Sequence, residues 1–287
     1  MDQNQFHRLI KEGEDKLRDA GIESSSAEVE IILLALLDIE RIDLYLYGAK
    51  LADEKIISNF KSIIERRATR YPLQYILGES WFYGRKFKVT EDVMVPTPET
   101  ELLCEIAINF TRYRKIKEPS ILDIGTGSGV VSVTMACELP HAVITALDIS
   151  KSALEIARQN AEDYYAEERI SFICSDMFEA LNPADKFDII LSNPPYISDD
   201  EYKELPPEVL ADPKISLVSG EEGMDIIKKL IDKAPSYLKD SGQLMFEIGY
   251  NQADMVADLT DKDDRYKKIS IIKDLNDIDR VVILALN

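Results

Sequence analysis

The strongest chemical signal is the stretch LDIGTGSG, in which Asp123 precedes Gly125, Gly127 and Gly129 directly behind an apolar run. Glycines in such a turn let a ligand approach the backbone N–H groups at the start of a helix. The pattern differs from the dinucleotide fingerprint G-x-G-x-x-G, because the third glycine comes one residue early and Val130 occupies its place. The spacing therefore favours a nucleoside ligand without a pyrophosphate.

Two more aspartates follow the next apolar runs along the chain. Asp148 comes 25 residues after Asp123, and Asp176 follows the run ISFIC. In an open α/β sheet the carboxyl ends of the strands line one crevice, so these carboxylates are expected to converge there. Asp148 can accept from both hydroxyls of a ribose, and Asp176 can accept from an exocyclic adenine amine. The sequence therefore predicts a pocket for adenosine.

A stiff polar loop, Asn193-Pro194-Pro195-Tyr196, follows another apolar run, FDIILS. Two consecutive prolines fix φ and remove two N–H donors, so the backbone there offers carbonyl acceptors in a rigid frame. Asn193 adds a side-chain carbonyl and Tyr196 a flat aromatic face. Together these groups could hold a planar NH2 group by accepting both of its hydrogens while the ring covers it.

Histidine and metal chemistry have little to build on. The chain has only two histidines, His7 and His141, so a Ser-His-Asp triad or a zinc site has almost no residues from which to be built. The three cysteines, Cys104, Cys137 and Cys174, are too far apart for a metal knuckle and are expected to be buried free thiols. The predicted chemistry must proceed without histidine or metal.

Two kinds of pattern divide the chain. From Gln5 to about Arg70, apolar residues recur at helical spacing, with Ser24–Ser26 as an expected helix cap, which predicts a small helical bundle. The next segment alternates around glycines and prolines and predicts a β-hairpin linker. The predicted domains are residues 1–72, the linker 73–97 and residues 98–287.

Beyond Glu99 strand and helix patterns alternate, which predicts an α/β fold with a mostly parallel sheet and helices on both faces. The runs KKISIIKD and RVVILAL end the chain without a helix between them, and so predict a hairpin with one antiparallel edge strand.

The net charge of −19 argues against nucleic acid as a partner, since phosphate neutralisation dominates that affinity. Residues 1–90 are nearly balanced, with 14 basic and 15 acidic side chains, so a polyanion could only meet residues such as Lys61, Arg66, Arg67 and Arg70. A solvated helix face is the expected use of these four. The run EIILLALLDIE is too short to span a bilayer, and the start lacks a signal layout, so a cytoplasmic protein is expected.

The crevice and the N-P-P-Y loop resemble the class I S-adenosylmethionine methyltransferases that methylate planar amino groups, a set that includes adenine, cytosine and glutamine enzymes. Over the whole chain the sequence is similar, almost end to end, to the peptide chain release factor glutamine methyltransferase family (HemK/PrmC). The similarity runs through the helical start, PLQYILGESWFYGRKFKV, VMVPTPETE, LDIGTGSG, LSNPPYI, FEIGYNQ and DRVVIL.

This resemblance implies a Rossmann-like seven-stranded methyltransferase domain behind an N-terminal substrate-recognition domain. It implies S-adenosylmethionine as methyl donor, S-adenosylhomocysteine as product and no metal. The implied substrate is the glutamine amide in the Gly-Gly-Gln motif of class 1 release factors, whose methylation tunes translation termination. We expect no stable nucleic-acid or membrane binding, and a monomer.

Carried onto matching positions, the resemblance implies three groups of site residues. The catalytic group is Asn193, Pro194 and Tyr196. The cofactor group is Asp123, Gly125, Thr126, Gly127, Gly129, Asp148, Ile149, Asp176, Met177 and Asn193. The substrate group is Asn193, Pro194, Pro195, Tyr196, Glu99 and Thr100.

The chain departs from the family pattern P-R-P-E-T-E at Thr97, which stands where the family has arginine. The stretch ELPPEVLADPKISLVSGEEGMDII resembles the family's substrate-side loop, with Ser219–Gly223 as a variant of its glycine-rich turn. An adenine amino methyltransferase acting on RNA or DNA is the main alternative, and the acidic catalytic part disfavours it. A methyltransferase-like domain that only binds a partner would be expected to lose Asn193 or Asp148, and both are present. The glycine spacing disfavours a nicotinamide oxidoreductase.

Overall fold

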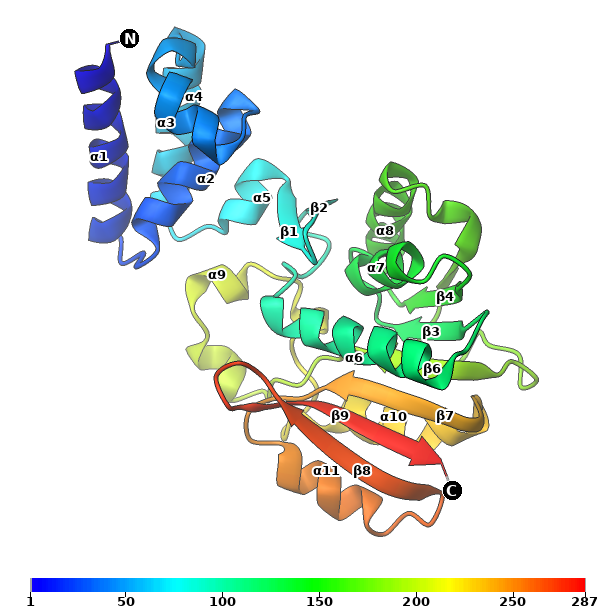
Figure 1. Cartoon of the computed structure of the whole chain (residues 1–287). Helices are drawn as coiled ribbons and strands as arrows, with labels where there is room; N and C mark the ends of the chain where they lie inside the picture. Colours follow the sequence, from blue (N-terminus) through cyan, green and yellow to red (C-terminus); the bar gives the residue numbers. More distant parts are fainter. Residues whose placement is uncertain (1, 287) are drawn as a thin grey trace. The chain divides into compact units, whose positions relative to one another are not determined.

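The computed structural model describes residues 2–286, with Lys268 described by its backbone alone, and the chain divides into two compact units (Figure 1). The first unit comprises the residues up to Gly78 together with Pro206–Ala211. The second comprises Glu79–Leu205 and the residues from Asp212 onward. The segment Pro206–Ala211 therefore belongs to the first unit, although the residues on both sides of it belong to the second.

The first unit is helical and is built on an apolar core. Its helices are α1 (Gln3–Asp19), α2 (Ser25–Leu37), α3 (Arg41–Leu51), α4 (Glu54–Ala68), α5 (Leu73–Leu77) and α9 (Pro207–Leu210). Asp2 caps α1 by accepting from Gln5 N, and Gln5 returns a bond to the Asp2 backbone, so two orphan donors are satisfied. Fully buried residues from α1, α2 and α4, among them Leu17, Ile32 and Phe60, form the core.

Two sequence expectations need correction in this unit. Ser24 precedes α2, but its hydroxyl donates to Glu28 Oε1 at 2.9 Å instead of accepting from a backbone N–H, so it makes no side-chain cap. Arg67 does not lie on a solvated face, because it is 5% exposed and pairs with both Glu28 and Glu208. Arg70 also pairs with Glu208.

These ion pairs explain why the basic cluster does not form a polyanion surface. Arg67 donates to Glu28 through Nε at 2.6 Å and through Nη2 at 3.1 Å, a two-bond geometry that satisfies the buried guanidinium. Its Nη1 donates to Glu208 at 3.0 Å. Half of the cluster therefore holds α2, α4 and α9 together, and only Lys61 and Arg66 are exposed.

The second unit contains a two-stranded hairpin and a seven-stranded sheet. The hairpin pairs β1 (Glu79–Phe82) with β2 (Arg85–Lys88), and the expected linker 73–97 also contains helix α5. The sheet has the order β5-β4-β3-β6-β7-β9-β8. Its strands are β3 (Ser120–Ile124), β4 (Val143–Asp148), β5 (Ile170–Cys174), β6 (Phe187–Ser192), β7 (Leu238–Glu247), β8 (Tyr266–Lys273) and β9 (Asp279–Leu286).

Helices cover both faces of this sheet, as the sequence predicts (Figure 1). The helices are α6 (Pro98–Arg114), α7 (Val130–Glu138), α8 (Lys151–Asp163), α10 (Asp225–Lys233) and α11 (Ala253–Thr260). Short 3₁₀ turns occupy Glu167–Arg169, Glu201–Glu204, Lys214–Ser216 and Ala234–Ser236. Side chains of successive strand residues point to opposite faces of the sheet. Ile121 therefore packs with α6, α7 and α8, while Leu122 packs with α10 and α11.

The order of the last two strands differs from the expectation. Strand β9 runs antiparallel to both β7 and β8 and lies between them, so the reversed strand is not at the edge of the sheet. Val281 and Val282 of β9 are fully buried, whereas the residues of β8 are mostly half-exposed. The more apolar run therefore takes the inner position, where both faces are covered.

The cysteines are free, but only one is buried. Cys104 is buried in α6, Cys137 is half-buried, and Cys174 is exposed at the end of edge strand β5, where the sheet gives its side chain no neighbour on one side. The expectation of three buried thiols is therefore wrong for Cys137 and Cys174. Within residues 2–286, no helix combines the length and the apolar character needed to cross a bilayer.

Candidate functional site

The site lies where the strand order reverses. β3 is followed in the chain by β4 and β5 on one side, and β6 then returns to pair with β3 on the other side. Ile124 and Ser192 therefore end neighbouring strands, and Ser192 Oγ donates to the Ile124 carbonyl at 2.8 Å. Ligands in open α/β sheets bind at the carboxyl ends of the strands at such a switch point. The glycine loop and the N-P-P-Y loop consequently begin side by side.

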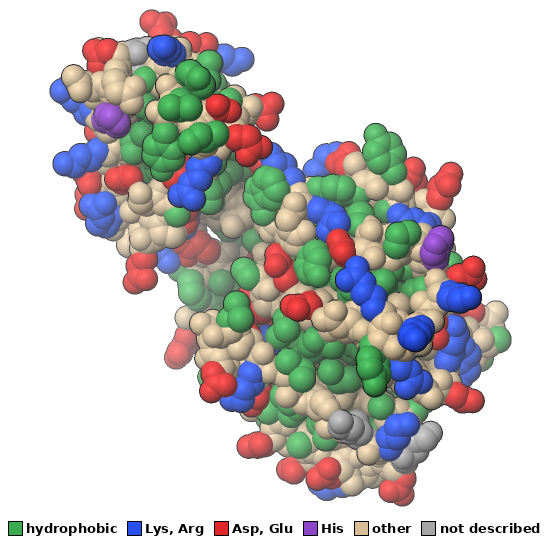
Figure 2. Space-filling view, viewed as in Figure 1, with side chains coloured by type: hydrophobic (Ala, Val, Ile, Leu, Met, Phe, Trp, Pro, Cys, Tyr) green, Lys and Arg blue, Asp and Glu red, His purple; other side chains and the backbone are tan. Residues whose placement is uncertain are grey.

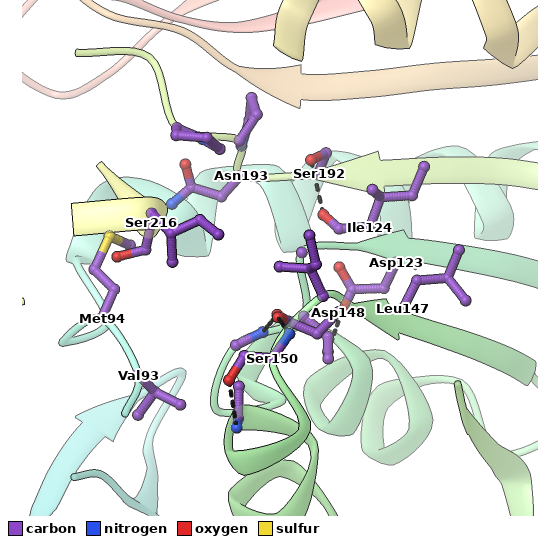
Figure 3. Close-up of a pocket in the computed structure, with 18 of the residues that line it drawn as sticks. Val93, Met94, Asp123, Ile124, Leu147, Asp148, Ser150, Ser192, Asn193 and Ser216 are labelled. Carbon is purple, nitrogen blue, oxygen red and sulfur yellow. Dashed lines mark hydrogen bonds between the residues drawn. The ribbon is translucent and has the colours of Figure 1, made fainter. Parts of the chain in front are cut away.

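A cavity of about 300 Å³ opens at this switch point, and Figure 3 shows its lining residues. This volume is at the lower end of the range of small-molecule sites. Most of the residues predicted for the site line it, namely Thr100, Asp123, Gly125, Thr126, Gly127, Asp148, Ile149, Asp176, Met177, Asn193, Pro194 and Pro195.

The glycine loop needs glycine for its backbone conformation. Gly125 and Gly127 have φ angles of 74° and 54°, in the left-handed region that side chains disfavour. A Cβ built on either residue meets no atom within 4 Å, so both face open space. Side chains at these positions would protrude into space that a ligand could use. These two glycines are therefore required by the backbone conformation and leave room for a ligand, and they are not required by close packing against other parts of the protein.

Asp123 holds this loop from below and is 1% exposed. Its Oδ2 accepts from Thr126 Oγ1 at 2.7 Å and also from Ser132 Oγ on α7. Burial raises the pKa of Asp123 to about 6, and the two hydroxyl donors act against that rise. The carboxylate therefore ties the start of α7 to the end of β3.

Asp148 presents a carboxylate at the end of β4 with both oxygens already oriented (Figure 3). Oδ2 accepts from Gly127 N and Oδ1 from Ser150 N, each at 2.9 Å. Burial raises the pKa of Asp148, while these N–H donors oppose the rise. Each carboxylate oxygen has two lone-pair sites, so the carboxylate can still accept hydrogen bonds from a diol in the cavity.

The third carboxylate, Asp176, lies in the turn that follows β5. Asp176 is exposed, and Met177 beside it adopts a φ of 47°. Ser175 stabilises the turn, because its N–H donates to the Asp148 carbonyl and its hydroxyl to the Met177 carbonyl. Ile149, 49% exposed, adds an apolar surface to the cavity.

Asn193 is held by a buried chain of hydrogen bonds. Its Nδ2 donates to Thr100 Oγ1 at 2.9 Å, and Thr100 donates in turn to Glu247 Oε2 at 2.8 Å. The Tyr196 hydroxyl donates to the other oxygen, Glu247 Oε1, at 3.0 Å. Glu247 is 1% exposed, and burial raises its pKa to about 7. Burial also raises the pKa of Tyr196, so this hydroxyl keeps its proton.

Three predicted residues are absent from the cavity lining of the described chain. Gly129 supports the site from behind, since its φ is 81° and a Cβ there would lie 3.0 Å from the Cβ of Ala157 on α8. Tyr196 does not offer its ring to the cavity, because the ring packs on the core beneath α10 and α11. Glu99 lies in the first turn of α6, outside the lining.

Sequence reasoning gave no role to Glu247, which is as deeply buried as Asp123. The FEIG stretch was the available signal, because it places a glutamate at the end of an apolar run. The apolar walls were missed as well, among them Met94, Pro213, Ile215 and Ile226. Among the described residues there is no group of His, Cys, Asp and Glu able to hold a metal.

Known proteins resemble this chain in both units. Residues 8–78 match the family model described as PrmC N-terminal domain, and residues 109–220 match the model described as Methyltransferase small domain. A release factor glutamine methyltransferase of Rhodopirellula baltica is 38% identical over 96% of this chain and 94% of its own length. One from Fusobacterium nucleatum is also 38% identical, over 96% of this chain and 77% of its own length. A methyltransferase structure from Pyrococcus furiosus shares the fold, with a TM-score of 0.52, 17% identity and coverage of 79% of this chain and 98% of that one.

Proposed function

This chain belongs to the release factor glutamine methyltransferase family, and we propose that it methylates a glutamine side-chain amide in the Gly-Gly-Gln motif of a class 1 release factor. The family resemblance seen in the sequence is thereby confirmed. The observation that carries the proposal is the Asn193 amide, fixed at the wall of a cavity beside a nucleoside cradle.

S-adenosylmethionine is the proposed methyl donor, and the residues present fit it. Gly125 and Gly127 leave open space before the loop, which suits the close approach of a ligand chain. Asp148 keeps acceptor positions for the two ribose hydroxyls, and Asp176, which also lines the cavity, is the proposed acceptor for an adenine amine. When bound, the donor supplies an electrophilic methyl group on a positively charged sulfur.

The acceptor NH2 is proposed to bind Asn193 and the carbonyl of Pro194. A carboxamide nitrogen is a poor nucleophile because its lone pair is delocalised, so the site must hold the geometry in which that pair faces the methyl group. Two acceptor oxygens fix both NH2 hydrogens and so supply that orientation. Alignment of this kind lowers the activation barrier by roughly 7–11 kcal/mol. A general base, by comparison, raises the reaction rate by about 10²- to 10⁴-fold.

The site needs no histidine on this scheme. After methyl transfer the nitrogen carries an extra proton, which is released to water. Asn193 suits the role better than aspartate, because a neutral acceptor does not pair a buried charge with the sulfonium and stabilise the ground state.

The helical unit is proposed to recognise the release factor. Figure 2 shows hydrophobic side chains gathered on this unit, and α3 exposes Ile42 by 65%, Tyr45 by 63% and Leu46 by 58%. Exposed apolar side chains one turn apart mark a contact surface. Leu46→Glu should therefore raise the KM for the release factor and leave the affinity for S-adenosylmethionine unchanged, as steady-state kinetics and calorimetry would measure.

The decisive experiment is transfer of a labelled methyl group from S-adenosylmethionine. The purified protein is incubated with a class 1 release factor, with the same factor carrying alanine at its Gly-Gly-Gln glutamine, and with total RNA and DNA. Label on the unaltered factor alone is expected. Label on RNA or DNA would refute the proposal in favour of an adenine amino methyltransferase, a reading that the net charge of −19 opposes.

A further inference from the structure

The hydroxyl of Thr100 determines which way the Asn193 amide points. A threonine hydroxyl has one hydrogen to donate and two lone pairs to accept with. Its hydrogen goes to Glu247, which as a carboxylate can only accept. Thr100 must therefore accept from Asn193 Nδ2, and the Thr97 hydroxyl, 3.3 Å away, must be the donor in its contact with Thr100. Every partner of Thr100 is consistent with one direction of donation.

This direction leaves the Asn193 carbonyl oxygen for the cavity. Within residues 2–286 no group donates a hydrogen bond to Asn193 Oδ1, and the residue lines the cavity wall. If the amide were reversed, its NH2 would face the NH2 of the acceptor, and two donors would oppose each other. The orientation of one amide thus decides whether the site offers an acceptor or a donor.

We propose that Glu247 is a positioning residue, which acts through Thr100 to keep the Asn193 carbonyl oxygen toward the acceptor amide. This reading deepens the proposed function and rests on it for the identity of the acceptor. Glu247 touches no part of the cavity itself and is 1% exposed at the end of β7. Its second oxygen holds the Tyr196 hydroxyl, so one carboxylate anchors both polar ends of the N-P-P-Y loop.

Protonation of Glu247 would reverse the relay. A carboxyl hydrogen on Oε2 would be donated to Thr100, whose own hydrogen would then be donated to Asn193 Oδ1. The pKa of Glu247 is raised to about 7, chiefly by burial, so this reversal lies within an accessible pH range. The charged groups around it are Glu99 on α6, which raises this pKa, and Arg280 on β9, which lowers it.

Tyr196 and Arg280, the other two groups near Glu247, do not take up the proton that Glu247 binds. The pKa of the Tyr196 hydroxyl is raised by burial, so it remains a donor throughout. Arg280 is engaged by Asp274 at 3.4 Å and by the Ile248 carbonyl at 3.1 Å. Methyl transfer should therefore decline as the pH falls through about 7, because the fraction of Asn193 that presents its oxygen declines with ionised Glu247.

The test is Glu247→Gln, with Asp188→Asn as the matched control. Asp188 is a half-buried carboxylate at the opposite end of the sheet, where it accepts from Ser120 N and Lys239 Nζ. The first readout needs no release factor: the side-chain ¹⁵NH2 signal of Asn193, identified by its absence in Asn193→Ala, is followed against pH. It should titrate with a midpoint near 7 in the parent and in Asp188→Asn, and lose that titration in Glu247→Gln.

The second readout is kinetic. Glu247→Gln should lower kcat by roughly 10- to 100-fold with unchanged affinity for S-adenosylmethionine, and should remove the loss of activity below pH 7. Thr100→Val, which removes the hydroxyl of the relay, should likewise lower kcat and abolish the dependence of activity on pH. An Asn193 signal that titrates identically in the parent and in Glu247→Gln would overturn the inference. A parent protein that shows this titration but does not label the release factor would refute only the proposed function.

Discussion

Replacing the buried amide of Asn160 should destabilise the second unit by more than the loss of one ordinary hydrogen bond. Asn160 lies on α8, is fully buried, and bonds the backbone of β2 on one side and the glycine loop on the other. Its Oδ1 accepts from Lys88 N at 2.7 Å, and its Nδ2 donates to the Lys88 carbonyl at 3.0 Å and to the Ser128 carbonyl at 2.8 Å. The amide thus pairs with Lys88 as a neighbouring strand would.

Asn160→Leu keeps the number and branching of the side-chain heavy atoms and removes all three bonds. A hydrogen bond contributes about 1 kcal/mol net, and a buried group left without a partner costs about 1–3 kcal/mol. With an N–H and two carbonyls of Lys88 and Ser128 left unpaired, we expect the free energy of unfolding to fall by about 3–5 kcal/mol. The Ser128 carbonyl lies between Gly127 and Gly129, so affinity for S-adenosylmethionine should also fall.

The measurement is urea unfolding followed by circular dichroism and by the fluorescence of Trp81, the single tryptophan, which lies in the hairpin of this unit. Tyr164→Phe is the matched control. The Tyr164 hydroxyl makes the same paired contact with Lys86, accepting from N at 2.8 Å and donating to O at 2.6 Å, but at an exposed edge. Water replaces such bonds, so the expected loss is about 1 kcal/mol. Equal losses in the two variants would refute the argument from burial.

Three other predictions follow from the site. Asn193→Ala should remove most methyl transfer, measured with labelled donor, and leave circular dichroism and donor affinity near the parent values; near-parent turnover would contradict its assignment. Asp148→Asn should weaken donor binding by about 1.5–3 kcal/mol, or roughly 10- to 150-fold in Kd by calorimetry, because a charged acceptor of the ribose is lost; an unchanged Kd would exclude the ribose role. Burial raises the pKa of Asp123 to about 6 and of Glu247 to about 7, above unfolded values near 4. The folded state then binds more protons between about pH 4 and 7, so urea unfolding should show stability falling as pH rises through that window, and a rise would contradict the burial argument.

The elements of the second unit were predictable because their signals are local. Ile121 and Leu122 alternate between two faces, and the buried residues Ala153, Leu154, Ala157 and Ala161 of α8 recur at helical spacing, so strand and helix could be told apart without the fold. The glycine loop was predictable for the same reason, since a left-handed turn such as that at Gly125 selects glycine directly. The general rule for strand ends then brought Asp148 and Asn193 to one crevice.

Contacts between distant residues were not predictable in this way. Thr100 and Glu247 are 147 residues apart, and Arg67 meets Glu208 across 141 residues. Each of these residues taken singly fits an ordinary solvated position, and only the closed fold shows that the pairs are buried. Tyr196 shows the same limit, because its sequence position predicts the loop but not the direction of the ring.

Buried acids that accept hydroxyl hydrogens link stability to function in this site. Asp123 accepts from Thr126 and Ser132, and Glu247 accepts from Thr100 and Tyr196, so each carboxylate orients groups that can otherwise donate in several directions. Their ionised forms are disfavoured by burial, and an apolar core would be more stable at neutral pH. A carboxylate nevertheless has a property that no apolar or amide side chain has, because it can only accept. It therefore imposes one direction on every hydroxyl bonded to it, and a reaction that depends on presenting an acceptor oxygen to an NH2 group requires that constraint.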